Sequence, residues 1–113
     1  MNPIRLSICM PTYNFGRFIG DALESILRQA ADDVEIVVLD GASTDNTSEV
    51  VRSFQARFPK LHYHRRDRRG GIDRDMAHAV ELANGEYCWF MTDDDLLKPG
   101  AITEISRKRN PLG

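Results

Sequence analysis

The apolar residues of the chain follow two spacings, which predict strands and helices. Four short runs are rich in apolar and β-branched residues and lie between Pro, Gly and polar clusters, as strands do. They cover residues 4–10, 34–39, 61–64 and 87–91. We expect the first strand to end at Pro11, because proline has no N–H to donate to a neighbouring strand.

Between these runs, apolar residues recur at intervals of three and four, the spacing of an amphipathic helix. The first predicted helix would bury Phe18 on its apolar face together with Leu23 and Ile26. Pro99 suits the first turn of the last helix, where its missing N–H does no harm. The four predicted helices cover residues 17–29, residues 48 to about 58, a segment around residues 76–83, and a segment that begins at Pro99.

The strands and helices alternate along the chain, and the sequence contains no internal repeat. This order predicts an α/β fold in which right-handed crossovers place helices on both faces of a mainly parallel sheet. We expect a single domain over residues 1–113, built as a three-layer sandwich around a Rossmann-like sheet with strand order 3-2-1-4. In that arrangement the first and fourth strands are neighbours, and the strand order reverses between them.

Composition limits the class of protein. The chain has 113 residues, 42% of them hydrophobic, and a formal net charge of −2, which fits a globular domain and argues against a general nucleic-acid binder. The apolar runs are too short for a membrane helix, and residues 1–10 lack the apolar block of a secretory signal. Cys9 and Cys88 lie inside predicted strands, so we expect reduced, buried thiols that lie near one another.

Basic side chains gather in the second half of the chain. A cluster of this kind would suit a phosphate-binding patch or a solvated loop, and the sequence leaves both interpretations open. Its members are Arg57, Lys60, Arg65, Arg66, Arg68, Arg69 and Arg74.

Polar clusters follow three of the four predicted strands. Because the carboxyl ends of parallel strands meet at one edge of the sheet, and this edge holds the ligand in open α/β folds, we expect the three clusters to converge there. They are Pro11, Thr12, Tyr13 and Asn14 after the first strand, residues 40–43 after the second, and Asp93, Asp94 and Asp95 after the fourth.

The aspartate triplet is the strongest single feature of the sequence. Three adjacent carboxylates repel one another, and a hard divalent cation such as Mg²⁺ or Mn²⁺ removes that penalty and favours oxygen ligands. The triplet therefore indicates a site for a cation and a diphosphate. The alternative is an exposed acidic turn at the start of the helix that begins at Pro99.

Two further residues at this edge allow two interpretations each. Asp40 would either bind a base or ribose, or accept hydrogen bonds from the turn that follows it; Tyr13 would either stack on a base or only pack. His62 and His64 alternate on one strand face without a third ligand at metal spacing, so we interpret them as structural. The chain has no G-x-G-x-x-G segment, Walker loop or serine nucleophile elbow.

Three motifs resemble a known family in order and spacing. They are SICMPTYN at residues 7–14, VVLDGASTDNT at residues 37–47 and LANGEYCWFMTDDDLLKPG at residues 82–100. Together they resemble the nucleotide-binding half of family 2 glycosyltransferases, which have the GT-A fold. The segment from Gly70 to Ile102 is most similar to the branch of bacterial sugar transferases that includes abequosyltransferases.

The resemblance implies roles for the matching positions. Residues 11–14 would line the nucleotide pocket, with Thr12 and Tyr13 near the base, and Asp40 would bind the base or ribose. Asp93 would bind ribose, while Asp94 and Asp95 would hold Mg²⁺ or Mn²⁺, which takes up charge on the leaving diphosphate. Added positive charge would come from Arg66, Arg69 or Arg74, among which the sequence does not choose.

The chain departs from the family pattern at two points. Where many relatives have Ala-Arg-Asn in the third helix, this chain has Asp75-Met76-Ala77, so we expect Asp73 and Arg74, with Asp75, to replace that segment at the nucleotide. Family members continue for a hundred or more residues, so we expect this chain to be a truncated GT-A domain whose catalytic base lies beyond Gly113. Alone it should transfer little sugar, and its uncovered apolar surface would favour a homodimer.

The implied activity is transfer of a sugar from a nucleotide-sugar donor to a saccharide or lipid-linked saccharide acceptor, in bacterial polysaccharide or O-antigen synthesis. The resemblance implies a cytoplasmic protein and is compatible with peripheral association of the full-length enzyme with the inner face of the membrane. The alternatives are a non-catalytic nucleotide-binding or self-associating remnant and a metal-dependent phosphodiesterase.

Overall fold

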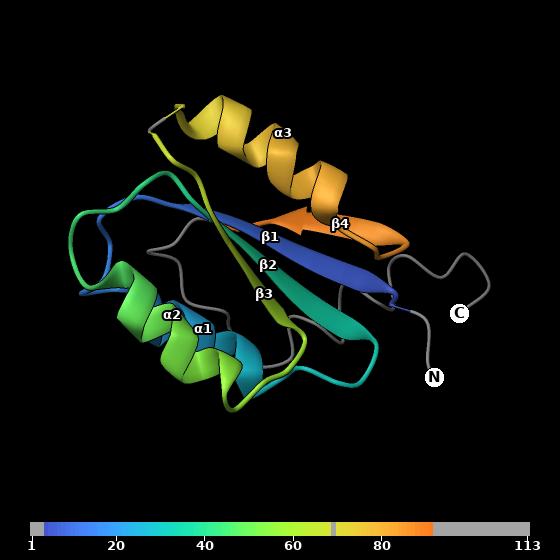
Figure 1. The fold of residues 1–113 in the computed structure, drawn as a ribbon. Helices are drawn as coiled ribbons and strands as arrows, with labels where there is room; N and C mark the ends of the chain where they lie inside the picture. The colour runs from blue at the N-terminus through green and yellow to red at the C-terminus, as the bar shows by residue number, and fades with distance from the viewer. Residues whose placement is uncertain (1–3, 69, 92–113) are drawn as a thin grey trace.

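Four parallel strands form one sheet at the centre of the molecule. The computed structural model describes residues 4–68 and 70–91. Strands β1 (Leu6–Thr12), β2 (Val34–Asp40), β3 (Leu61–Arg65) and β4 (Tyr87–Phe90) lie in the order β3-β2-β1-β4 (Figure 1). This confirms the predicted α/β class and strand order, including the reversal between the first and fourth strands.

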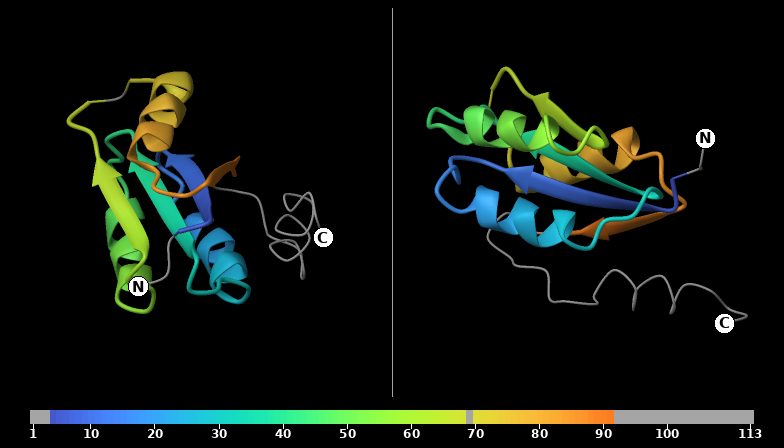
Figure 2. Two further views of the ribbon diagram at one scale, coloured as in Figure 1. Left: turned by 90° about the vertical axis from the view of Figure 1, so that its right-hand side faces the viewer. Right: turned by 90° about the horizontal axis from the view of Figure 1, so that it is seen from below.

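Three helices cover the two faces of this sheet. Helices α1 (Ile19–Leu27) and α2 (Thr47–Gln55) lie together on one face, and α3 (Ile72–Leu82) lies alone on the other (Figures 1 and 2). The predicted three-layer arrangement is therefore present. The helix predicted from Pro99 lies outside the described residues, and no helix in the described part of the chain has the length and apolar character to cross a membrane.

The two central strands are buried along their whole length. Every residue of β1 and β2 is buried, as expected for strands covered on both faces. The layer between the sheet and α1 and α2 is the larger core, and a smaller cluster of Cys9, Val37, Leu39 and Ala79 lies under α3. Burial, with the Cys88 thiol beside it, raises the pKa of Cys9 to about 12. Both cysteines are free thiols; Cys9 is buried as predicted, whereas Cys88 is only half-buried.

The prediction that Pro11 ends the first strand is wrong, because β1 continues through Pro11 to Thr12. Alternate residues of a strand hydrogen-bond to opposite sides. The Cys9 carbonyl accepts from Met91 on the β4 side, and the Thr12 carbonyl accepts from Gly41 on the β2 side. Pro11 therefore faces the β4 side, just beyond the last β1–β4 pair at Cys9 and Phe90, where no donor is required of it.

The burial predicted for Phe18 is also wrong. Phe18 immediately precedes α1 and is 49% exposed. Its ring lies 5.6 Å from the Arg17 guanidinium carbon, a cation–π contact at the surface. The helix is shorter than predicted, and its buried side begins at Ile19.

A buried carboxylate joins three elements at the amino end of the sheet. Glu35 Oε2 accepts hydrogen bonds from Ser7 Oγ and the Asn84 backbone N–H, both at 2.6 Å, and His62 Nε2 lies 3.3 Å from Oε1. Burial alone would raise the pKa of Glu35, but the bonds from Ser7 and Asn84 and the nearby His62 outweigh it and hold the pKa below its usual value. The Gly85 N–H in turn donates to Ser7 Oγ. We call this network the Glu35 clasp.

Candidate functional site

The loops that follow β1 and β2 meet at the carboxyl edge of the sheet. Thr12 pairs with Asp40 at the ends of the two strands, and the Gly41 N–H donates to the Thr12 carbonyl oxygen at 2.9 Å (Figure 1). The first two of the three predicted clusters therefore lie side by side. We call this edge, formed by residues 11–14 and 40–43, the rim.

Asn14 connects the two loops of the rim. Its backbone N–H donates to Ser43 Oγ at 2.9 Å, and its side-chain Oδ1 accepts from the Thr44 N–H at 2.7 Å. Asn14 has a φ of 53°, a left-handed conformation that asparagine tolerates better than most residues. In the structure the exposed Asn14 side chain thus holds one loop against the other.

Asp40 is completely enclosed at the end of β2, with 0% exposure. Its Oδ1 accepts from the Ser43 N–H at 2.8 Å, and its Oδ2 accepts from the Tyr63 hydroxyl at 2.5 Å. Burial and the hydrogen bond to this carboxylate raise the pKa of Tyr63 to about 12. Of the two interpretations of Asp40, the one in which it holds the following turn is visible in the structure.

A second carboxylate, Asp75, reaches the rim from α3. It is 4% exposed, and its Oδ1 lies 3.3 Å from Arg66 Nη1. A Cβ atom on Gly41 would lie 2.8 Å from Asp75 Oδ2, so any other residue at position 41 would require this carboxylate to move. Asp73, Arg74 and Asp75 are all charged, so residue type alone does not show which of them is buried. The helical spacing of four from Asp75 to the buried Ala79 is the signal that could have identified Asp75.

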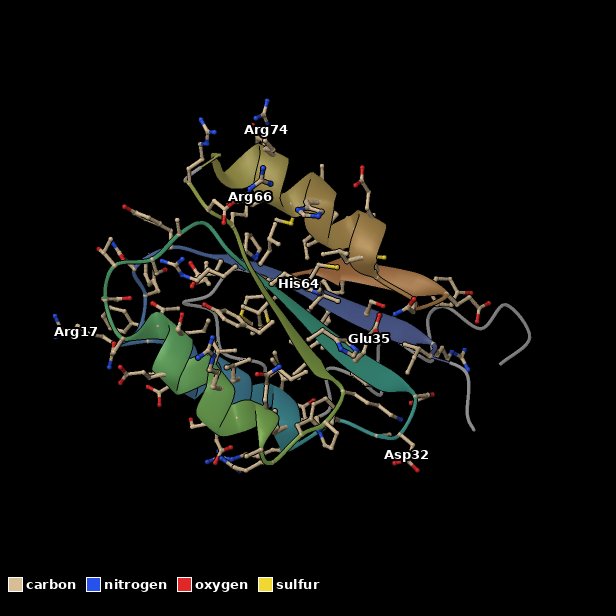
Figure 3. All side chains as sticks on the ribbon, viewed as in Figure 1. Arg17, Asp32, Glu35, His64, Arg66 and Arg74 are labelled. Atoms are coloured by element: carbon tan, nitrogen blue, oxygen red, sulfur yellow. The ribbon has the colours of Figure 1, made fainter. Side chains whose placement is uncertain are left out.

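The other two residues of that segment lie elsewhere. Asp73 and Arg74 are exposed on the first turn of α3, and Arg74 points away from the sheet whereas Arg66 lies beneath the helix (Figure 3). The structure therefore brings Asp75 to the rim and leaves its two neighbours at the surface.

The third predicted cluster, Asp93, Asp94 and Asp95, lies outside the described residues. What the structure shows is the strand before it. β4 runs parallel to β1, and the Met91 N–H donates to the Cys9 carbonyl oxygen at 3.0 Å. The carboxyl end of β4 is thus at the same edge of the sheet as the rim.

The basic residues that the structure describes divide between the surface and a hollow beside the rim, and Arg69 lies outside the described residues. Arg57 pairs with Glu24 at 2.8 Å, and Lys60 donates to the Asp32 carbonyl, both at the surface of the molecule. Arg65 instead donates to the Ser43 carbonyl oxygen at 2.9 Å, which ties β3 to the rim. Beside it lies a hollow of about 300 Å³ lined by Leu39, His64, Arg65, Arg66, Asp67, Arg68 and His78.

The histidines of β3 lie against other side chains of the chain. His62 lies against Glu35 in the clasp. Burial lowers the pKa of His64, and the neighbouring His62 and His78 lower it further. Among residues 4–68 and 70–91, no group of three or more His, Cys, Asp or Glu side chains is arranged to hold a metal ion.

A comparison with known families identifies the chain. The sequence profile of the family described as "Glycosyl transferase family 2" matches residues 7–108. The chain belongs to this family. The resemblance of the three motifs is thereby confirmed, and the parallel sheet with its strand order is that of the GT-A glycosyltransferase fold.

Relatives of this glycosyl transferase family 2 chain include proteins of Salmonella typhimurium, S. aureus and Pyrobaculum calidifontis. It is 40% identical over 101 residues to abequosyltransferase RfbV of Salmonella typhimurium, covering 86% of this chain and 30% of that protein. A crystal structure of S. aureus TarS in complex with UDP-GlcNAc matches with a TM-score of 0.86 and 26% identity, over 92% of this chain and 30% of TarS.

A third similar protein is a mannosyltransferase, PcManGT of Pyrobaculum calidifontis, solved in complex with GDP-Man and Mn²⁺. It matches with a TM-score of 0.83 and 28% identity, over 98% of this chain and 35% of that one. The chain spans about a third of the length of RfbV and of two other curated relatives, and a smaller share of two chondroitin synthases.

Proposed function

We propose that the chain forms the donor-binding part of a glycosyltransferase that transfers a sugar from a nucleotide-sugar to a saccharide or lipid-linked saccharide acceptor. The observation that carries this proposal is the rim: two polar loops joined at the carboxyl edge of a parallel sheet, beside the point where the strand order reverses. Ligands of open α/β sheets bind at such points. TarS and PcManGT, which share the fold, were solved with UDP-GlcNAc and GDP-Man.

The proposed nucleotide-binding residues divide by their surroundings. Thr12 and Tyr13, with Pro11 before them, would contact the nucleoside, while Asn14 and Asp40 hold the two loops that form its binding surface. Asp73, Arg74 and Asp93 remain predictions: the first two are exposed at the start of α3, and Asp93 lies outside the described residues.

We further propose that Asp94 and Asp95 hold Mg²⁺ or Mn²⁺. Their carboxylates are the hard oxygen ligands that these cations prefer. They follow a strand whose carboxyl end lies at the edge of the rim, and PcManGT was solved with Mn²⁺. When bound, the cation would stabilise the negative charge that develops on the leaving diphosphate.

A base must take the proton of the attacking acceptor hydroxyl if the reaction inverts the sugar. The two described carboxylates at the rim, Asp40 and Asp75, are buried and lie against other groups of the chain. Neither is placed to reach an acceptor. We therefore place the base outside residues 4–91.

Titration tests the proposed function directly. UDP-, GDP-, CDP- and dTDP-sugars are added with and without Mn²⁺, and heat of binding is measured. We expect one of them to bind in a metal-dependent way, and Asp94→Ala to remove that dependence while Glu81→Ala, an exposed substitution on α3, does not. A folded sample that binds none of the four contradicts the proposal, and hydrolysis of phosphodiesters without such binding would favour the phosphodiesterase.

The remaining proposals concern the surroundings of the protein. The two free thiols suit a reducing cytoplasm, and a lipid-linked acceptor would bring the full-length enzyme to the inner face of the membrane. Self-association into a homodimer is checked by light scattering, where a monomer at all concentrations contradicts it.

A further inference from the structure

Asp75 has an unused hydrogen-bond acceptor in a buried position. The side chain is 4% exposed, and its Oδ1 is buried without a hydrogen-bond partner among the described residues. The ion pair with Arg66 Nη1, at 3.3 Å, offsets the charge of Asp75 but does not satisfy this oxygen. Buried polar atoms in folded proteins nearly always have a partner, so an exception indicates a partner that is not part of the chain.

The carboxylate lies where the two loops of the rim meet. The point at which a Cβ of Gly41 would stand is 2.8 Å from Asp75 Oδ2. The same point is 3.7 Å from the Thr12 carbonyl oxygen and 3.8 Å from Tyr13 Cδ1. Asp75 Oδ2 and the ring of Tyr13, the side chain proposed to contact the nucleoside, thus border the same point above Gly41.

Arg66 fixes the position of Asp75. The Arg66 backbone N–H donates to the Asp40 carbonyl oxygen at 2.9 Å, which anchors Arg66 at the ends of β2 and β3. Its guanidinium then extends to the carboxylate of Asp75 on α3. Because Arg66 holds the Asp75 carboxylate in one orientation, a ligand would meet its oxygen atoms in a fixed position, as recognition of a ligand requires.

The two carboxylates of the rim differ in what they can still bind. Both oxygens of Asp40 accept hydrogen bonds from the chain, and Asp40 is 0% exposed. Asp75 retains an oxygen without a hydrogen bond, Oδ1, while its Oδ2 lies on the Gly41 side of the rim. Of the two, Asp75 is thus the one with capacity for a donor group on a ligand.

We propose that Asp75 recognises the nucleobase of the donor: its carboxylate accepts a hydrogen bond from an N–H group on the Watson–Crick edge of a base that lies on Tyr13. This inference rests on the proposed function and adds a residue that determines which base is bound. The ligand class is a nucleoside diphosphate, or its sugar ester, whose base presents an N–H at that edge. Arg66 acts as a positioning residue.

The test compares three ligands on the full-length protein with Mn²⁺ by calorimetry. They are the nucleoside diphosphate that the wild-type protein prefers, ribose 5-diphosphate, which lacks the base, and pyrophosphate. We expect Asp75→Ala, which removes the acceptor, to weaken binding of the nucleoside diphosphate by about tenfold to a hundredfold, the range for a hydrogen bond to a charged group. Binding of the two ligands without a base should change by less than about twofold, within the error of such comparisons. Glu81→Ala also removes a carboxylate, at an exposed position of α3, and should alter none of the three affinities.

Three other patterns of affinity among these ligands would contradict the inference, and each indicates a different role for Asp75. An equal loss of affinity for all three ligands would mean that Asp75 maintains the structure of the rim. A loss of affinity shared by the nucleotide and ribose 5-diphosphate would mean that Asp75 binds the ribose. No loss for any ligand removes Asp75 from the site. Failure of the wild-type protein to bind any nucleotide overturns the proposed function itself and the inference with it.

A second measurement needs no substitution at Asp75. Methylation of the N–H on the Watson–Crick edge of the preferred nucleotide should weaken binding to the wild-type protein by at least about tenfold. If Asp75→Ala folds, as judged by circular dichroism, the methyl group should weaken its binding little, because the acceptor is already absent. Unchanged binding of the methylated nucleotide to the wild-type protein overturns the inference.

Discussion

At the scale of single residues, the hydrogen bond from Tyr63 to Asp40 holds the rim from below. Asp40 has no exposed surface, and Tyr63 supplies the partner of its Oδ2 from the neighbouring strand. Ser48 Oγ lies 2.6 Å from the same hydroxyl, so the bond also reaches the start of α2. Removal of the Tyr63 hydroxyl would leave a buried carboxylate oxygen without a partner.

We expect Tyr63→Phe to lower the free energy of unfolding by about 2 kcal/mol, since the lost bond is to a charged group. Urea denaturation followed by circular dichroism measures the change. Ser53→Ala is the matched control, because it also removes a hydroxyl but one that is exposed and bonded within its own helix; it should shift the free energy by less than about 0.5 kcal/mol. Equal effects of the two substitutions would show that the Asp40–Tyr63 bond does not stabilise the rim.

Residue type and order alone identify most of the rim but not the roles within it. Asp40 stands at the end of an apolar strand, where a carboxylate needs partners, and this is visible in the sequence. That its partners are Ser43 and Tyr63 depends on which strand lies beside β2 and which way Tyr63 faces. Asp75 is harder still, because its neighbours Asp73 and Arg74 are equally polar and only the docking of α3 buries one of the three.

At the scale of elements, two glycines of the fold differ in the space around them. A Cβ on Gly85, in the turn between α3 and β4, would lie 2.5 Å from Ser7 Oγ and 2.7 Å from the Ser7 backbone nitrogen. A Cβ on Gly20, within α1, would meet only Val50 and Phe54 side-chain atoms at 3.5 Å or more. A side chain at position 85 would therefore clash with the backbone of β1, whereas a methyl group at position 20 would make ordinary packing contacts.

Gly85→Ala should therefore destabilise the protein by about 2 kcal/mol or more, because overpacking forces the turn away from β1 and weakens the Glu35 clasp. Gly20→Ala should instead stabilise it by about 0.5 kcal/mol, since alanine is the better helix former. Thermal and urea unfolding of both variants provide the measurement. The same sign of change at both positions would contradict this account of the turn.

The elements themselves follow largely from the sequence. The β-branched run of β2 and the Pro and Gly residues between segments predict four strands and three of the helices, and chirality and connection rules predict their order. The end of β1 could not be predicted. Whether Pro11 is tolerated depends on where β4 stops pairing with β1, and no local pattern records that.

At the scale of the whole molecule, the two ends of the sheet differ in the groups that they carry. The carboxyl edge carries the rim, while the amino end is fastened by the Glu35 clasp, at a distance from Arg66 and Arg74 (Figure 3). The clasp depends on an ionised carboxylate, because the Ser7 and Asn84 groups donate to it. The charge state of a buried group thus affects the stability of the entire fold.

Stability should fall as the pH is lowered, in two steps. The pKa of His64 is depressed below its usual 6.5, so the unfolded chain binds this proton more readily and the fold loses stability as the pH falls below 6.5. The pKa of Glu35 is also depressed, below its usual 4.5, so its contribution is present above pH 4.5 and is lost as the pH falls through the folded-state pKa.

Urea denaturation at pH 7.5, 5.5 and 3.5 resolves the two steps, using about one pH unit on either side of each usual value. His64→Gln should remove the upper step, and Glu35→Gln should remove the lower step while also reducing stability at pH 7.5. A stability that is constant over this range, or that rises as the pH falls, would contradict the assignment.

The contact between Gly41 and Asp75 has an evolutionary consequence. Two residues that are far apart in the sequence occupy neighbouring space, so the side chain at one position limits which substitutions the other position tolerates. Lineages that keep aspartate at 75 cannot acquire a methyl group at 41 without displacing the carboxylate. Lineages in which position 75 shrinks to alanine are released from that constraint, and alignment columns 41 and 75 should covary accordingly.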